Sequence, residues 1–456
     1  MKGIIMCVGL VAASLIAQPV LAQEAASDGN YSLQEMLGLA LEHHVEMRKA
    51  DLSILEGKQK VREVKAQALP QLNANANLTD NLLLPVLILP GEFTGNPGTV
   101  SQVRIGTQYN FTAAASASQQ IFNQSVFTGL QAAKASEEFY ELSKSLTEEQ
   151  VIEQVASLYY QVLITQHQLE QMESTLQKLE ENVRLVALQV DAGFVKKTDL
   201  SRLKVSQTNL KTQAQGISDG LSQQKNLLKY YTGIPLEQDV SLKGLNPAEM
   251  PGQVQLADDS EVTNLTSYRL LDAQQHLYSL EEKSFKSGYF PTLALTAQYA
   301  YNGVGNNFDY FKSKENSTLN WYDNASIGLQ LSIPIFDGFR KDAQIQQSKI
   351  HLLKVQEDKR STEKMLNLQR ANALNTIRTS RESLLAQQEN VTLAQEVYNE
   401  GQQTYSEGIS SLSDLLDAET ALTDAQLGYA SALLQYRLSE LQLLKSEGNI
   451  KSLVNQ

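Results

Sequence analysis

The hydrophobic residues between positions 151 and 190 recur at alternating steps of four and three. The series begins Val151, Val155, Leu158 and runs to Val190 with Thr165 as its one polar member. Heptads sustained over this length are typical of a coiled coil. Similar series predict six helices, over 33–66, 124–191 and 197–231 and again over 260–287, 339–404 and 411–446. At about 1.5 Å per residue the longest spans roughly 100 Å, more than a globular domain needs.

Shorter segments alternate between apolar and polar residues with a period of two. They lie at 71–78, 103–112, 292–301 and 326–333, and Asn73, Asn75 and Asn77 share one side of the first. This alternation fits a barrel wall between lipid and water. It fits a half-buried soluble sheet equally well. The strands alone therefore leave both architectures open.

The two halves of the chain resemble each other. The matched pairs include Arg48 with Arg269, Asp51 with Asp272, Gly193 with Gly408, Asp199 with Asp414 and Gly233 with Gly448. We predict a tandem duplication, with a first repeat at 23–235, a connector at 236–255, a second repeat at 256–450 and a tail at 451–456. Each repeat has the order helix, strand pair (about 69–122 and about 290–336), long helix and helix. The fold class is mainly α with a β-barrel section.

The first 22 residues have the features of a secretory signal peptide. Lys2 precedes the apolar segment 4–17, and small residues predict cleavage after Ala22. The apolar segment is short for an uncleaved anchor, which is the alternative. The only cysteine, Cys7, lies inside it and away from the cleavage point, so we expect no lipid attachment and no disulfide. No later apolar run is long enough for a membrane-spanning helix.

Charge and motif content exclude several functional classes. The chain has 38 basic and 51 acidic residues, a formal charge of −13, which disfavours nucleic acid as a partner. None of the five histidines has metal-ligand spacing, so no metal site is predicted. There is no phosphate-binding glycine loop and no nucleophile elbow. The sequence predicts neither an enzyme nor a cofactor.

Four strands per chain predict an oligomer if the strands lie in a membrane. An open sheet edge in lipid leaves backbone groups unpaired. About eight strands form the smallest barrel with a filled interior. Two chains would supply eight strands and three would supply twelve, and only the larger number leaves an open lumen.

Three local motifs resemble one known family. The segment from Tyr405 to Leu422, YSEGISSLSDLLDAETAL, resembles the periplasmic tip turn and descending helix of the TolC-like outer membrane efflux proteins, also called outer membrane factors. Residues 193–200, GFVKKTDL, resemble the equivalent tip of the first repeat, and residues 335–338, IFDG, resemble the strand-to-helix junction. The order and the duplication of these motifs extend the resemblance over the chain after the signal peptide.

The resemblance implies a homotrimer. It would share one twelve-stranded barrel in the outer membrane of a Gram-negative bacterium, embedded in outer membrane lipid, and extend an α-helical tunnel into the periplasm. Such a duct passively conducts cargo in a tripartite efflux or type I secretion system, together with an inner-membrane pump and a periplasmic adaptor (membrane fusion) protein. The cargo and the class of pump are not specified by the sequence.

The resemblance also implies a gate at the helical tip. Asp414 and Asp417 match the paired aspartates that ring the tunnel constriction, and their spacing places both on one helix face. Three chains would supply six carboxylates, and such a ring attracts cations. The alternative is an ordinary solvated helix start, where the helix dipole favours aspartate.

A clasp between the two repeats is implied at the same tip. Tyr405 matches a tyrosine that holds the closed tip, and Asp199 matches its acidic partner. The arginine that joins this clasp in the family falls at Ser410, so Lys196 or Lys197 is a candidate substitute. Gly193 and Gly408 permit tight turns, which in the family contact the adaptor.

The segment from Leu82 to Pro90 is strongly apolar and lies in the first extracellular loop of this topology. A structural role would be to pack over the barrel mouth or to extend a strand. A functional role would be to act as a lid or as a protein contact.

The second candidate function is a non-transporting periplasmic or surface coiled-coil scaffold with a soluble β-sandwich cap. Outer-membrane fractionation separates this function from a duct.

Overall fold

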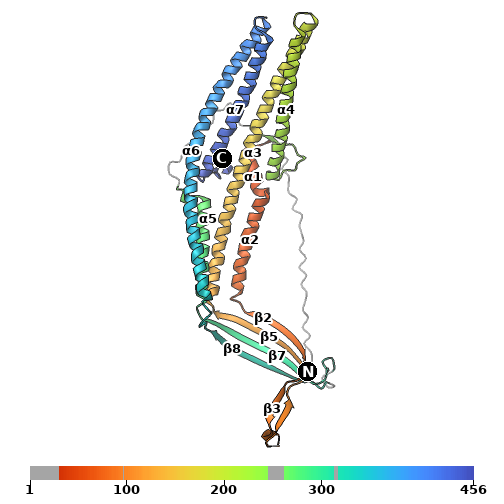
Figure 1. Cartoon of the computed structure of the whole chain (residues 1–456), viewed down its shortest axis with the longest axis vertical. Helices are drawn as coiled ribbons and strands as arrows, with labels where there is room; N and C mark the ends of the chain where they lie inside the picture. The colour runs from red at the N-terminus through yellow and green to blue at the C-terminus, as the bar shows by residue number, and fades with distance from the viewer. Residues whose placement is uncertain (1–29, 96, 245–260, 313–316, 456) are drawn as a thin grey trace.

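The computed structural model describes residues 30–95, 97–244, 261–312 and 317–455. The molecule is elongated, with a bundle of long helices at one end and a four-stranded sheet at the other (Figure 1). The predicted signal peptide, residues 1–22, and residues 245–255 of the predicted connector lie outside the described residues.

The helices of the bundle occupy most of the chain. Their bounds are α1 Leu33–His43, α2 Val45–Ala66, α3 Gln124–Asp191, α4 Lys197–Thr232, α5 Thr266–Ser287, α6 Arg340–Ser406 and α7 Leu412–Ser446, with a short α8 at Ser452–Asn455. The predicted helices at 124–191, 197–231, 339–404 and 411–446 are thus confirmed almost to the residue. Every helix within the described residues is too short or too polar to be a candidate membrane span.

The core of the bundle lies where α1 packs on α3. Met36, Leu37, Ile152 and Val155 are fully buried there. The predicted apolar series of α3 is buried along most of its length, as Val162 and Leu179 show. Burial of this stripe holds the long helices together, since helix propensity alone supplies little stability.

The single helix predicted over 33–66 is wrong, because the chain breaks at His44. This residue is extended (φ −63°, ψ 135°) and its Nδ1 accepts a hydrogen bond from the backbone N–H of Glu46 at 3.3 Å. Its ring stacks on Tyr231 of α4 at 5.0 Å. Burial lowers the pKa of His44, which favours the neutral ring that this cap requires. The stacking contact comes from α4, which is distant in the sequence, so the hydrophobic pattern of 33–66 does not predict this break.

The sheet contains strands β2 Gln71–Asp80, β5 Tyr109–Phe122, β7 Thr292–Gly305 and β8 Asn320–Ser332. They pair antiparallel in the order β2-β5-β7-β8, so the prediction of four main strands is confirmed. Among the described residues, β2 and β8 each pair on one side only. A separate two-residue pair joins β1 Asn30–Tyr31 to β6 Ser241–Leu242.

The strand register sorts apolar and polar residues onto opposite faces of this sheet. One row across the four strands contains Leu72, Ala117, Ala297 and Ile327. The adjacent row contains Asn73, Ser116, Gln298 and Ser326. The apolar face is not covered within the chain, since Leu72 is 79% exposed and Ile327 is 76% exposed. A soluble sandwich would bury this face.

The strand predicted over 103–112 is also wrong. Gly106, at φ 111°, separates two strands that the alternation joined. Residues 100–104 form β4 Val100–Arg104, which pairs with β3 Val86–Pro90 in a separate hairpin, whereas β5 begins at Tyr109. The apolar segment 82–90 therefore contains its own strand and does not extend a strand of the main sheet.

Candidate functional site at the helical tip

Helices α3 and α4 form one helical pair, and α6 and α7 form a second. Both pairs end in turns of the same geometry, at the end of the molecule farthest from the sheet (Figure 1). Gly193 (φ 81°) follows α3, and the backbone N–H of Phe194 donates to Gln189 O at 2.9 Å. Gly408 (φ 75°) follows α6, and Ile409 N–H donates to Thr404 O at 2.9 Å. A side chain at either glycine would meet open space, so the positive φ is what requires glycine.

Asp414 caps the start of α7. Its carboxylate accepts hydrogen bonds from Ser411 N at 3.0 Å and Ser411 Oγ at 2.8 Å, while its own backbone N–H donates to Ser411 Oγ at 3.3 Å. This reciprocal arrangement is a capping box. The hydrogen bonds from the side chain and backbone of Ser411 lower the pKa of Asp414, so the group is ionised at neutral pH.

Asp417 lies one turn further along α7 and is exposed, as is Asp414. Its carboxylate has no hydrogen bond or ion pair to another described residue, so it differs from Asp414 in carrying charge without a capping role. Asp414 therefore stabilises the start of α7, and the carboxylates of both residues are exposed near the tip.

Tyr405 and Asp199 are brought together from the two helical pairs. Tyr405, near the end of α6, is half-buried and packs against an apolar cluster that includes Leu203 of α4 and Leu412 of α7. Burial raises the pKa of its phenol, and the nearby charge of Asp199 raises it further. No hydrogen bond joins the two side chains, so the interaction between them is electrostatic, while the ring of Tyr405 packs on the apolar cluster.

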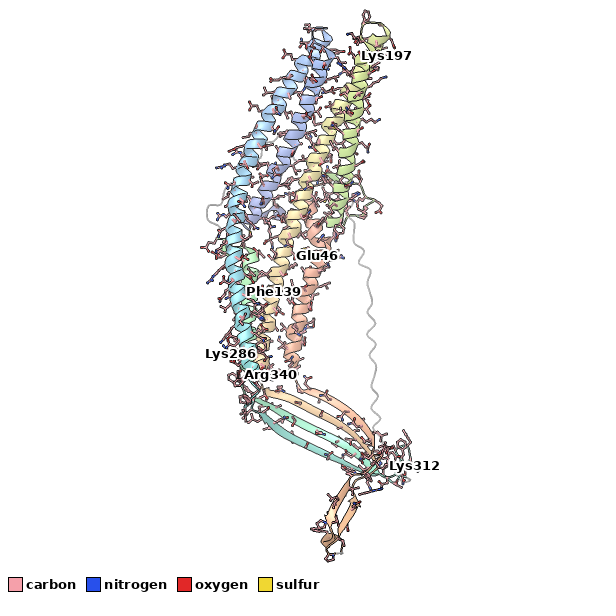
Figure 2. The ribbon with its side chains drawn as sticks, in the orientation of Figure 1. Glu46, Phe139, Lys197, Lys286, Lys312 and Arg340 are labelled. Carbon is pink, nitrogen blue, oxygen red and sulfur yellow. The ribbon has the colours of Figure 1, made fainter. Side chains whose placement is uncertain are left out.

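The residues around Ser410 provide only a local link. Ser410 Oγ accepts a hydrogen bond from Thr404 Oγ1 at 3.1 Å within the α6–α7 turn. Lys196 and Lys197 are exposed at the start of α4, and Figure 2 shows Lys197 at the tip. Within the described residues neither lysine forms an ion pair, and their predicted role in a clasp stays a prediction.

A buried carboxyl group that was not predicted from the sequence lies near the start of α7. Glu419 is only 8% exposed and lies on the α6-facing side of α7, in line with Leu415 and Leu422. Burial raises its pKa to about 7. Tyr398 of α6 lies beside it at 4% exposure. The available signal was the spacing, because Glu419 follows the buried Leu415 by four residues.

One segment of the sequence matches a known protein family. Residues 271–449 match the sequence profile of the family described as outer membrane efflux protein. No curated protein sequence matches the chain.

Three solved structures show how widely the fold is shared. The transmembrane channel protein CusC superposes with a TM-score of 0.73 at 17% identity, over 91% of this chain and 92% of its own. The outer membrane channel MtrE of Neisseria gonorrhoeae, in its open state, gives 0.71 at 20% identity over 91% and 88%. The outer membrane channel CmeC of Campylobacter jejuni gives 0.71 at 16% identity over 91% and 85%.

Within residues 271–449 the chain resembles the outer membrane efflux protein family, and over 91% of its length it shares the fold of these solved channels. In this shared fold the four-stranded sheet and the helical tip lie at opposite ends of the molecule.

Proposed function

We propose that three copies of this chain form one exit duct that crosses the outer membrane and the periplasm. The observation that carries the proposal is the sheet with two unpaired edges, β2 and β8, and one uncovered apolar face. β5 and β7 have 14 residues each and β8 has 13, enough for tilted strands to cross the hydrocarbon core.

Pairing between copies satisfies these edges. Each unpaired backbone group in hydrocarbon costs several kcal/mol, so β2 of one copy pairs with β8 of the next. Three four-stranded sheets give twelve strands, enough to leave a lumen. The polar rows, such as the one containing Asn73 and Gln298, then face water, and the rows containing Leu72 and Ile327 face lipid.

The helices continue this duct into the periplasm. α3 has 68 residues and α6 has 67, which corresponds to roughly 100 Å each. At their far end the exposed turns at Gly193 and Gly408 are the contacts for a periplasmic adaptor, which links the duct to an inner-membrane pump. The pump determines the cargo, in either a drug-type tripartite efflux system or a type I secretion system.

The gate of the duct lies at the same tip. Three copies bring Asp414 and Asp417 into one ring of six carboxylates, which attracts cations and binds divalent ions. The contact of Tyr405 with Asp199 holds the two helical pairs of each chain together in the closed state. Opening separates these pairs.

Native mass spectrometry of the detergent-purified protein tests the assembly. The expected species contains three chains and forms conducting channels in a planar bilayer. A folded monomer without conductance would overturn the proposal and would favour the coiled-coil scaffold.

A further inference from the structure

The hairpin formed by β3 and β4 projects from the outer end of the sheet, opposite the helical tip (Figure 1). We call the described residues 82–95 and 97–105 the outer hairpin. Its strands β3 and β4 pair antiparallel, with Leu87 opposite Val103 and Ile88 opposite Gln102. Gly91 N–H donates to Thr99 O at 2.8 Å and Ile105 N–H donates to Pro85 O at 3.0 Å, so the pairing extends along its length. A one-turn helix, η1 Gly91–Thr94, forms its end.

The outer hairpin exposes large apolar side chains on both of its faces. Ile88 and Val100 lie on one face and are 62% and 68% exposed, whereas Leu87 and Val103 form a pair on the other face and are 46% and 38% exposed. Phe93, in the turn between the strands, is 80% exposed. An isolated two-stranded hairpin is only marginally stable in water. Exposed apolar side chains gathered in this way normally mark a contact with another surface.

The position of the outer hairpin argues against lipid tails as that surface. An aromatic cluster at the outer end of the sheet includes Phe111, Tyr310 and Trp321, with ring centroids 5.8 to 6.0 Å apart. Aromatic girdles mark the boundary between hydrocarbon and headgroups in membrane barrels. The hairpin starts beyond this boundary, since Asn81 N–H donates to Gln108 O at 2.7 Å just after β2 ends and just before β5 begins.

The connection of the outer hairpin points to other copies of the same chain. It joins β2, an open edge strand, to β5. In the trimer proposed above, on which this inference rests, each β2 lies next to another copy, and the three hairpins stand around one mouth. A hairpin with two apolar faces suits contact with two neighbours.

We infer that the three outer hairpins pack against one another and form an apolar lid over the extracellular mouth of the duct. The lid restricts passage from outside, and departing cargo displaces it. It is separate from the periplasmic gate, because the two lie at opposite ends of the molecule (Figure 1).

Cross-linking of trimers in nanodiscs tests the contact. The chain has one cysteine, Cys7, within the predicted signal peptide, so Ile88→Cys introduces a single thiol into the mature protein. Oxidation is expected to give disulfide-linked pairs of chains. Lys312→Cys is the matched control, because Lys312 is exposed in the other outer loop (Figure 2) and is expected to stay unlinked.

Conductance tests the lid. Replacement of residues 82–105 by Asn-Gly is expected to raise single-channel conductance and to sensitise cells to large antibiotics. The double variant Leu87→Ser/Ile88→Ser keeps the chain length and is expected to act in the same direction if the deletion impairs folding.

The outcomes separate this inference from the proposed function. Absence of a trimer in native mass spectrometry would overturn both. A conducting trimer with no Ile88→Cys cross-link and unchanged conductance in the hairpin variants would overturn the lid alone. Quenching of Ile88→Trp by brominated lipid tails, in a Trp321→Phe background, would also overturn it, because lipid would then cover the hairpin.

Discussion

The carboxyl group of Glu419 on α7 and the phenol of Tyr398 on α6 are buried beside each other in the helical pair that carries Asp414 and Asp417. Glu419 lies two residues beyond Asp417, within the apolar contact formed by Leu415 and Leu422. Close packing continues next to it, since a side-chain carbon on Gly401 would lie 3.7 Å from Ala418 Cβ. The packing of α6 on α7 thus includes a group that changes charge near neutral pH.

This burial predicts a pH-dependent stability of the α6–α7 pair. Glu419 titrates near 4.5 when unfolded and near 7 when folded. Its burial is most favourable below about pH 4.5, where it is neutral in both states, and this stability is lost as the pH rises through about 7. The difference corresponds to roughly 3 kcal/mol per chain.

Thermal unfolding followed by circular dichroism at about pH 5 and pH 8 measures this effect. Glu419→Gln is expected to lose much of the wild-type stability difference between the two conditions. Glu400→Gln, an exposed change on α6, is the control and should keep it. An unaltered difference in Glu419→Gln would show that the carboxyl group is not the source.

The contact at Tyr405 predicts that packing, more than the hydroxyl group, holds the two helical pairs. Tyr405→Phe keeps the ring in the apolar cluster that includes Leu203 and Leu412 and is expected to leave conductance close to wild type. Tyr405→Ala removes the ring and is expected to raise conductance severalfold in planar bilayers. Equal opening in both variants would instead assign the contact to the hydroxyl group.

Separate substitutions distinguish the N-terminal capping of α7 from the negative charge that Asp417 carries. Ser411→Ala removes the N-cap side chain and is expected to cost about 1 kcal/mol of stability while divalent block persists. Asp417→Asn leaves the cap intact and is expected to weaken divalent block without a change in stability. Thermal unfolding and bilayer recording together measure both effects, and the reverse pattern would refute the assignment.

Adjacent residues on β8 test which face of the sheet meets lipid. Leu329 lies on the apolar face and Gln330 on the polar face. Arginine on a lipid-facing strand position costs about 2–4 kcal/mol near the bilayer centre, so Leu329→Arg is expected to reduce trimer yield in outer membrane fractions. Gln330→Arg is the matched control and should assemble. Equal loss in both variants would contradict the assigned faces.

The sequence predicted the regular elements well where one period ran without interruption. The apolar series from Val151 to Val190 belongs to one helix, α3, and the duplicated tip motifs placed both turns correctly. Prediction failed where local conformation overrides the period. Gly106 interrupts the alternation across 103–112, and His44 interrupts the helix at 33–66 through a cap and a stacking contact.

Glu419 was missed for a different reason. Glutamate is a strong helix former and is almost always exposed, so its type suggests a solvent-facing position. Its spacing from Leu415 agrees with a buried position, and the contact with α6 establishes that this glutamate is buried. The pairing of Tyr405 with Asp199 also required the family resemblance, because more than two hundred residues separate them along the chain.

Single-channel recording tests the central claim, a trimeric duct gated by carboxylates at its helical tip. We predict a small, cation-selective conductance that divalent cations block from the periplasmic side. Asp414→Asn plus Asp417→Asn removes both charges and should relieve the block and reduce cation selectivity. A channel with unchanged block and selectivity in this double variant would contradict the claim that these carboxylates form the gate.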